Sequence, residues 1–383
     1  MSPFRTLRSI ASIALLLAPF TLLRAVEPAA SSPFYKQVAE HFAAWDRDHD
    51  DALSINEIET AVHDPAVTGE AAAAAAALRR AVRADKDVAP VTKAGLLERL
   101  TTPSTKERPQ PKFEAHYAAA LERIRSTKRE LFVDDAPRLE TISQGRMGDC
   151  FLLASLGTCA ERDPARLKRM LRPAGDGKAS IAYGDGKTRE LNLPTDAELV
   201  IGATTRNTGV WAGMYELAVG TVMLERAKSD RHATPFSLIG VGGSPHVPLE
   251  ILTGHKVRRH GCELYRAKMN EHGGSADDLD PLRKDLLAAF ADRRLIVGGC
   301  GPIGKQAIVK GIYYNHSYGV LDYDEKTDTV LFWNPFGNTF TPKGEPGLKN
   351  GYPTKNGKFR VPLNEAVMWF GSFSLETDEA SEK

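Results

Sequence analysis

One cysteine of this chain has the sequence surroundings of a nucleophilic thiol. Cys150 lies in the segment QGRMGDCFLLASL, between a glycine-containing turn and an apolar run that predicts a buried helix. We expect Gly145 and Gly148 to turn the backbone tightly, because glycine tolerates positive φ, and Asp149 to cap the helix. The helix dipole would favour a thiolate at this end. The sequence therefore predicts a Cys150 pKa lowered from about 8.5 to about 7 or below.

Three further residues supply the groups that such a thiol needs. Gln144 stands upstream of Cys150, and His316 and Asn334 follow in NHSYGVLDY and WNPFGNTF. The set fits acyl transfer: Cys150 would attack a peptide carbonyl, and His316 would take up and return the proton. Asn334 would fix the tautomer of the imidazole. Gln144 and the backbone N–H of Cys150 would donate to the developing oxyanion.

The spacing of His316 and Asn334 predicts that they meet. Their segments flank a polar turn at residues 324–328, which indicates a β-hairpin. Counted from the centre of that turn, the two residues lie nearly opposite each other, where Cβ atoms are about 4.5–5.5 Å apart. A register slip of one residue would put one of them on the wrong face.

The same residues carry a resemblance to a known family. The order Gln, Cys, His, Asn is that of papain-like thiol proteases, and the motifs resemble the calpain family, whose members typically have QGxxGDCW, GHAY and NPWG. This chain has QGRMGDCF, NHSY and NPFG, with Phe151 and Phe336 where the family usually has Trp. WAGMYELAV (211–219) is similar to the family's W-x-x-L-L-E-K-A-Y, and GGSPHVPLEILTG (242–254) to a later glycine-rich segment. The resemblance runs roughly from residue 130 to residue 375.

The resemblance implies a papain-like α+β fold and a cysteine endopeptidase of a secreted, bacterial type. A mainly helical lobe would carry Cys150, a strand-rich lobe would carry His316 and Asn334, and extended polypeptide would bind between them. Family members also bind calcium in this core. Glu216 stands where they have an acidic residue for this, but Thr141 stands where an Asp ligand is expected, so Glu216 is more readily interpreted as a capping or ion-pairing residue.

A separate calcium motif lies near the N-terminus. Residues 46–57, DRDHDDALSINE, match an EF-hand loop, which presents oxygen ligands at positions 1, 3, 5, 7, 9 and 12. Position 6 normally holds glycine because it needs positive φ; here it is Asp51, at a cost of about 1 kcal/mol and up to about tenfold in affinity. The predicted Ca²⁺ ligands are Asp46, Asp48, Asp50, the Ala52 carbonyl, Ser54 and Glu57.

A second loop could start at Asp85, with Asp87 at position 3, but Ala89 at position 5 and Leu96 at position 12 cannot chelate. We interpret it as a structural partner that has lost its metal. An unrelated linker is the alternative. In mammalian calpains the EF-hand domain follows the protease, whereas here it precedes it. Whether calcium regulates activity or only stabilises the N-terminal unit is therefore open.

The chain divides into four predicted parts. Residues 1–25 have the pattern of an export signal, and residues 26–100 predict an all-α, EF-hand-like domain. A proline-rich linker spans residues 101–112, and residues 113–383 form the protease-like domain, opening with a helix from 113 to about 131. The first part of that domain is mostly helical by pattern. Its last hundred residues carry strand patterns such as LIVGG, QAIVKGIYY, YGVLDY and TVLFW, followed by a charged tail, ETDEASEK, that we expect to fray.

Composition excludes some partner classes and leaves two other functions open. With 50 basic and 49 acidic residues, no nucleic-acid partner is indicated, and no segment after the export signal predicts a membrane span. Four cysteines imply no disulfide framework. One alternative is a calcium-binding interaction protein on an inactive protease scaffold. The other is a transglutaminase-like acyl transferase, in which Asp322 would be the carboxylate to examine.

Overall fold

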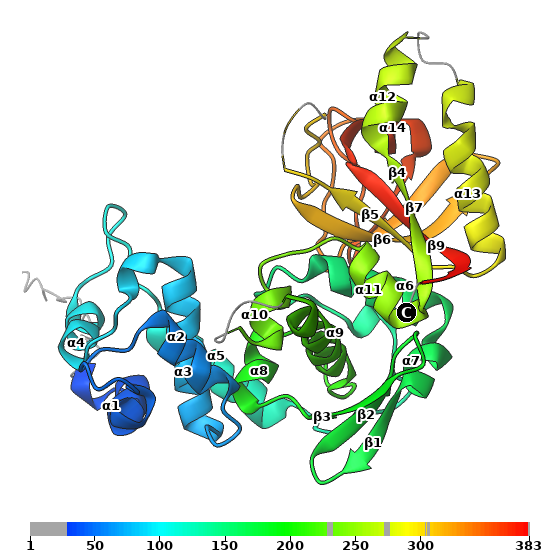
Figure 1. Cartoon of the computed structure of the whole chain (residues 1–383). Coiled ribbons are helices and arrows are strands. Elements are labelled where there is room, and N and C mark those ends of the chain that lie inside the picture. Colours follow the sequence, from blue (N-terminus) through cyan, green and yellow to red (C-terminus); the bar gives the residue numbers. More distant parts are fainter. Residues whose placement is uncertain (1–28, 228–232, 272–275, 303, 305–306, 382–383) are drawn as a thin grey trace, which may run out of the picture.

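The computed structural model describes residues 29–227, 233–271, 276–302, 304 and 307–381. This part of the chain is mixed α+β, and all its strand pairs are antiparallel. Figure 1 shows a helical N-terminal body beside a larger body that contains both sheets. The predicted export signal, residues 1–25, lies outside the described residues. Within them, no helix combines the length and the apolar character needed to cross a membrane.

The N-terminal body is built around α3, a helix rich in alanine. Residues 71–77 are all alanine and all buried, since a methyl side chain lets neighbouring helices approach α3 on several sides. Helices α1, α2 and α5 pack on it, and so does α8 of the larger body. The elements are η1 (Ala29–Ser31), α1 (Pro33–Trp45), α2 (Ile55–His63), α3 (Gly69–Ala84), η2 (Lys86–Val88), α4 (Lys93–Thr101) and α5 (Phe113–Ser126).

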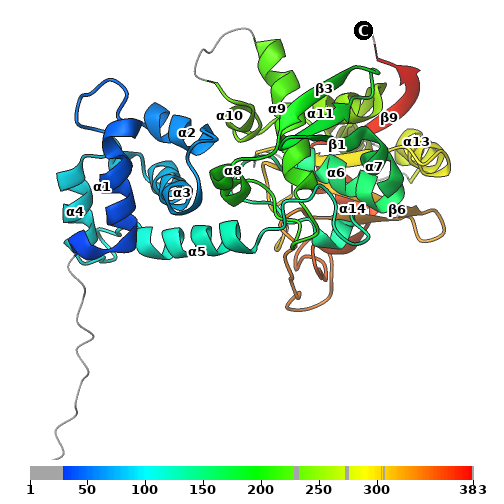
Figure 2. The same cartoon turned by 90° about the horizontal axis from the view of Figure 1, so that it is seen from below.

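Helix α5 joins the two bodies. It ends at Ser126, five residues before the expected end near 131, and packs on both α3 and α8. Its first residue, Phe113, stacks on Phe34 of α1 with ring centroids 5.1 Å apart. Figure 2 shows α5 running from the N-terminal helices to the larger body. One apolar core continues from the N-terminal helices into the helical part of the larger body.

The first half of the larger body surrounds α6, whose residues from Cys150 to Ala160 are all buried. It also contains a three-stranded sheet in the order β1-β2-β3, where the sequence indicated mostly helix. Its elements are η3 (Leu139–Thr141), α6 (Cys150–Arg162), α7 (Pro164–Met170), β1 (Leu171–Gly175), β2 (Lys178–Ala182), β3 (Thr188–Asn192), α8 (Asp196–Ile201), α9 (Trp211–Ala227), α10 (Pro235–Ile239) and α11 (His246–Thr253).

The second half is a six-stranded sheet in the order β4-β9-β5-β6-β7-β8, with a separate apolar core. Figure 1 shows α12, α13 and α14 around it and α6 beneath it. The elements are β4 (His255–Gly261), α12 (Cys262–Glu271), η4 (Ala276–Leu279), α13 (Asp280–Ala291), β5 (Ile296–Cys300), β6 (His316–Asp324), β7 (Thr329–Trp333), β8 (Lys358–Pro362), α14 (Leu363–Trp369) and β9 (Ser372–Ala380).

The strand predictions are confirmed for β5, β6 and β7 and wrong in two other places. The described part of QAIVKGIYY, residues 307–314, is irregular. The tail does not fray at Glu376, because strand β9 continues to Ala380 and Glu376 is 1% exposed. Its carboxylate accepts hydrogen bonds from the Leu295 backbone and contacts the His255 imidazole, each at 2.8 Å. All four cysteines are free and buried.

Candidate active site and calcium loop

The cysteine loop, residues 144–149, is held by the ends of two helices. Arg146 N donates to Ile201 O at the end of α8 (3.2 Å), and Gly148 N donates to Gly240 O after α10 (3.0 Å). A Cβ on Gly145 would lie 2.2 Å from the Gly202 carbonyl oxygen, and one on Gly148 would lie 2.8 Å from that of Gly240. Neither glycine has positive φ. The expectation of a positive-φ turn was therefore wrong, and glycine is needed here for close backbone approach.

Cys150 is the first residue of α6, as the sequence predicted, but its thiol is not activated by its position. Asp149 occupies the N-cap without making a side-chain cap. Burial raises the pKa of Cys150, and hydrogen bonds from the backbone and side chain of Ser317 only partly oppose this effect. The predicted lowering of the pKa is wrong for this conformation, because desolvation of the thiolate outweighs the helix dipole.

His316 and Asn334 are in contact. Nε2 of His316 lies 2.8 Å from Oδ1 of Asn334, and both residues are buried. Asn334 is itself fixed, because its Nδ2 donates to Asn338 Oδ1 (2.8 Å) and its Oδ1 accepts from the Phe336 backbone (3.0 Å). An acceptor at Nε2 selects the tautomer that leaves Nδ1 free to accept a proton.

The register of the hairpin differs from the predicted one by two residues. Strand β6 pairs with β7 through Gly319 and Trp333, and the register shifts between Val320 and Asp322. Asn334 therefore lies across from a position two residues beyond His316. A shift of two keeps both side chains on one face, so the predicted contact survives.

Aromatic rings enclose the imidazole. Phe336 stacks on it with centroids 4.4 Å apart, and Tyr318 meets it edge-on at 5.0 Å. Burial lowers the pKa of His316 to about 4, against the opposing hydrogen bond to Asn334. The imidazole is thus neutral near pH 7 and able to accept a proton. Phe336 is 40% exposed and forms the solvent side of this enclosure.

Gln144 belongs to the site but is turned toward its own loop. Its Nε2 donates to Met147 O at 2.7 Å, and its backbone N–H donates to Pro335 O at 2.9 Å. The second bond ties the cysteine loop to the segment that carries Asn334. In this conformation the Gln144 amide nitrogen donates to a carbonyl of its own loop.

The thiol and the imidazole come from adjoining elements. Helix α6 packs on β6, and Cys150 contacts Ser317, the residue after His316. The hydrogen bonds found in the described residues include none between Cys150 and His316. The structure therefore brings His316 and Asn334 into contact, places Cys150 beside them, and leaves the thiol without its base as a direct partner.

The sequence analysis did not predict a pair of buried acidic residues beside the cysteine loop. Asp149 and Glu216 are both fully buried and interact with each other. Burial, together with the Asp149 carboxylate, raises the pKa of Glu216 well above its usual range. Glu216 also accepts from Ala203 N at 2.8 Å. Two acidic residues in segments far apart in the sequence gave no signal that they would meet.

Three carboxylates converge in the acidic loop at residues 46–57. One carboxylate oxygen from each of Asp46, Asp48 and Asp50 lies within 4.8 Å of the others. Asp50 N and Asp51 N donate to the two oxygens of Asp46, at 3.2 and 3.0 Å. Asp51 has φ +62°, which confirms the predicted positive φ at position 6.

The end of this loop starts helix α2. Ser54 and Glu57 form a reciprocal capping box, and the Glu57 carboxylate also accepts from Arg47 N at 2.6 Å. Burial opposes ionisation, but hydrogen bonds from Ser54 and the loop backbone lower the pKa of Glu57. Leu53 and Val91 form an antiparallel bridge with N–O distances of 2.8 and 2.9 Å, so the two loops are paired.

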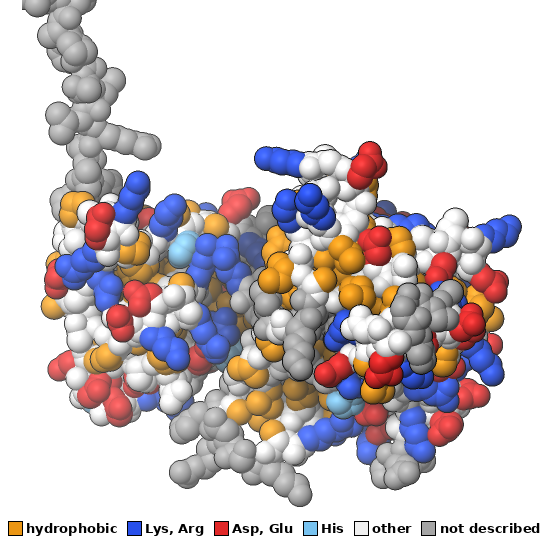
Figure 3. Space-filling view, turned by 90° about the horizontal axis from the view of Figure 1, so that it is seen from above, with side chains coloured by type: hydrophobic (Ala, Val, Ile, Leu, Met, Phe, Trp, Pro, Cys, Tyr) orange, Lys and Arg blue, Asp and Glu red, His pale blue; other side chains and the backbone are white. Residues whose placement is uncertain are grey.

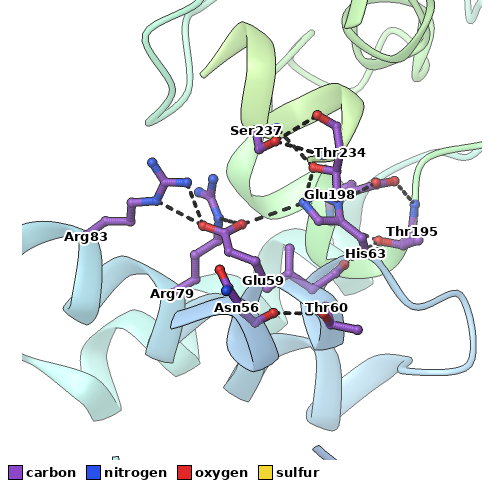
Figure 4. Close-up of polar contacts among 11 residues, drawn as sticks. Asn56, Glu59, Thr60, His63, Arg79, Arg83, Thr195, Glu198, Thr234 and Ser237 are labelled. Carbon is purple, nitrogen blue, oxygen red and sulfur yellow. Dashed lines mark hydrogen bonds and ion pairs between the residues drawn. The ribbon is translucent and has the colours of Figure 1, made fainter. Parts of the chain in front are cut away.

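The far end of α2 contacts the larger body through His63. Its Nδ1 lies 2.8 Å from Glu198 of α8, and its Nε2 lies 3.1 Å from the Thr234 hydroxyl at the start of α10. Burial alone would lower the pKa of His63, but Glu198 and Glu59 outweigh it and raise the pKa. Figure 4 shows Glu59 between His63 on one side and Arg79 on the other.

Comparison with known proteins adds no further assignment. No protein-family model matches the chain, and a search of curated proteins finds no match.

Proposed function

We propose that the protein is a calpain-like cysteine endopeptidase with Cys150 as nucleophile, His316 as base and Asn334 as the residue that orients the base. The observation that carries the proposal is the 2.8 Å contact between His316 Nε2 and Asn334 Oδ1. It lies at the start of the strand on which α6 packs. The proposed arrangement is papain-like, with the thiol on a helical lobe and the imidazole on a sheet lobe.

The proposed reaction begins from a neutral pair. The thiol of Cys150 is protonated, because burial raises its pKa, and the imidazole of His316 is neutral, because burial lowers its pKa to about 4. As sulfur attacks the peptide carbonyl carbon, the thiol proton passes to the imidazole. Asn334 Oδ1 then accepts from Nε2–H of the imidazolium and stabilises it.

The second half of the reaction returns the proton. The imidazolium protonates the leaving amine as the C–N bond breaks, which leaves a thioester on Cys150. Water then attacks the thioester while His316 takes its proton, and the acid product leaves as the thiol is restored. Gln144 Nε2 and the Cys150 backbone N–H would donate to the oxyanion in both halves. This requires Gln144 to release Met147 O, and the thiol and imidazole to approach each other.

The acidic loop fits a hard cation such as Ca²⁺. Asp46, Asp48 and Asp50 converge, and the position of Glu57 at the start of α2 follows the EF-hand pattern. The charges concentrated there favour a cation: desolvation and then Asp50 and Glu57 raise the pKa of Asp48. Bound calcium would neutralise this repulsion and hold the loop against α2. Ala52 O and Ser54 complete the proposed ligand set.

The transglutaminase-like alternative has less support. Asp322 pairs with Arg360 of β8 at 2.5 Å, whereas an amide, Asn334, contacts the imidazole. The other alternative is a calcium-binding protein on an inactive protease scaffold. It has less support because the chain retains all four proposed catalytic residues, Gln144, Cys150, His316 and Asn334.

The experiment that tests the proposal is hydrolysis of unfolded casein by the mature protein with reductant, beside Cys150→Ala. Each protein is assayed with calcium and with a chelator, and circular dichroism shows that both are folded. We expect new peptide termini with the native chain and none with the variant. Crosslinked casein without cleavage would indicate the transferase, and no reaction from a folded chain with a free thiol would refute the endopeptidase.

A further inference from the structure

A large groove lies between the N-terminal body and the cysteine loop. Its volume is about 1030 Å³, at the upper end of the range for ligand sites. One wall is the C-terminal half of α3, and the floor is residues 110–112 with α5 from His116 to Arg123. The other wall is the cysteine loop and the end of α8, and Phe336 lies at the edge. Two of its lining residues, Gln144 and Phe336, also belong to the candidate active site.

The lining of this groove is basic and contains no Asp or Glu. We call it the basic groove. Its cationic side chains are Arg79, Arg80, Arg83, Lys112, Arg123 and Arg146. Figure 3 shows Lys and Arg side chains gathered along the hollow that separates the N-terminal body from the rest of the molecule. Because the whole chain is nearly neutral, this concentration of one sign is local.

Half of these cations are already engaged. Arg79 and Arg83 pair with Glu59 at 2.8 and 2.7 Å. Arg123 donates to the carbonyls of Val200, Gly202 and Ala203. By contrast, no ion pair or hydrogen bond of the side chains of Arg80, Lys112 and Arg146 occurs within the part of the chain that the structure describes.

The unengaged cations repel one another. The charge of Arg146 adds to burial in lowering the pKa of Arg80. Burial, followed by the charges of Arg80, Arg146 and Lys112, lowers the pKa of His116 to about 4. His116 Nδ1 is buried without a hydrogen-bond partner. An anionic ligand would relieve the repulsion and give these donors an acceptor.

We propose that the basic groove binds an acidic stretch of the polypeptide substrate, a few residues from the bond that is cleaved. The inference rests on the proposed function, because it takes Gln144 as the end of the groove nearest the reacting carbonyl. The groove offers cations to carboxylates and the methyl groups of Ala76, Ala77, Ala119 and Ala120 to side-chain carbons. Phe336 is the only Phe, Tyr or Trp in its lining, which fits a peptide better than the stacked bases of a single-stranded nucleic acid.

The test compares four matched fluorogenic peptides that share one cleavable core. Each carries either four Glu or four Gln residues, placed either before or after the core. We expect kcat/KM for the Glu peptide to exceed that for the Gln peptide about tenfold in dilute salt, with the flank on one side only. The preference should fall toward unity at about 500 mM salt, because exposed charges are screened. The double variant Arg80→Gln/Lys112→Gln should lose this preference. Arg172→Gln, on exposed strand β1, should keep it.

A binding assay separates failure of the groove from failure of the proposed function. Anisotropy of a labelled Glu-flanked peptide is measured with Cys150→Ala and with Cys150→Ala/Arg80→Gln/Lys112→Gln. Binding that needs the two cations supports the groove even where no peptide is cleaved. Equal cleavage and equal binding of Glu and Gln peptides overturn the groove while leaving the protease proposal standing. A single-stranded oligonucleotide that binds more tightly and displaces the acidic peptide would overturn the assignment to a polypeptide.

Discussion

At the scale of single residues, burial decides the chemistry of the candidate site. The helix dipole at Cys150 and the contact with Ser317 both favour a thiolate, yet burial keeps the pKa of the thiol raised. The same burial keeps the His316 imidazole neutral. The site therefore holds a protonated thiol beside a neutral imidazole, and in the proposed reaction the thiol ionises only as it attacks.

The protonation state of Cys150 predicts how fast it is alkylated at different pH values. A raised pKa means that the thiolate fraction is small near neutrality and grows about tenfold per pH unit up to about pH 9. We expect the rate of iodoacetamide labelling at Cys150, followed by mass spectrometry, to rise throughout that range. A preformed thiolate–imidazolium pair would instead give a rate that is flat from about pH 5 to about pH 8.

Asn334 tests the positioning of the base. Replacing it with Ala removes the acceptor at His316 Nε2, and a hydrogen bond to a charged group contributes about 1.5–3 kcal/mol. We expect kcat for casein-derived peptides to fall about 10- to 150-fold, with little change in KM. The matched control is Asn338→Ala, which removes only the partner of Asn334 Nδ2 and should cost less. Equal losses in the two variants would contradict the role of Asn334 as the orienting residue.

At the scale of elements, the sequence predicted those features whose causes lie in residues close together in the chain. The contact of His316 with Asn334 followed from one hairpin, and a bulge near Leu321 moved the register without separating them. The positive φ of Asp51 followed from a loop motif.

Features with distant causes could not be predicted. Gly145 is glycine because of a carbonyl of Gly202, which belongs to another element. Glu376 is buried because Leu295 and His255, from segments far away in the sequence, supply its partners. The sequence around Gly145 indicates only a turn, and the sequence around Glu376 indicates only a charged tail.

The acidic loop offers a prediction at this scale. Asp51 holds φ +62°, a conformation that costs a non-glycine residue about 1 kcal/mol or more. Asp51→Gly should therefore stabilise the loop and tighten calcium binding up to about tenfold, measured by isothermal titration calorimetry. Asp50→Asn, which removes charge from a proposed ligand, should weaken binding. Unchanged affinity in Asp51→Gly would show that the loop does not keep this conformation when calcium binds.

At the scale of the whole molecule, a continuous set of contacts joins the acidic loop to the cysteine loop. Helix α2 carries Glu57 in its first turn and His63 in its last. His63 contacts α8 and the start of α10, and the residues at the ends of those two helices accept hydrogen bonds from Arg146 and Gly148. A change at one loop can affect the other only through an element that has two discrete arrangements, because both loops must shift the same equilibrium.

These contacts predict that calcium affects catalysis and that His63 carries the effect. Calcium at about one hundred times its dissociation constant stabilises whatever state binds it by about 2.7 kcal/mol. A coupling of about 1–2 kcal/mol would then change casein turnover about 5- to 30-fold between calcium and chelator. We expect His63→Ala to bind calcium with unchanged affinity but to lose most of that difference in turnover, because α2 no longer contacts Glu198 and Thr234.

The control removes a charge of the opposite sign and leaves α2 unchanged. Glu70→Gln alters an exposed ion pair between α3 and Arg125 of α5, so it should retain the full calcium effect. A calcium effect that persists undiminished in His63→Ala would mean that the loop acts by another route. If the native chain binds calcium but its turnover does not respond, the loop serves stability alone. Calcium should then protect the N-terminal body against unfolding in urea without changing turnover. The contacts of His63 favour coupling, because it is buried between two carboxylates and breaking those contacts would leave Glu198 without its imidazole partner.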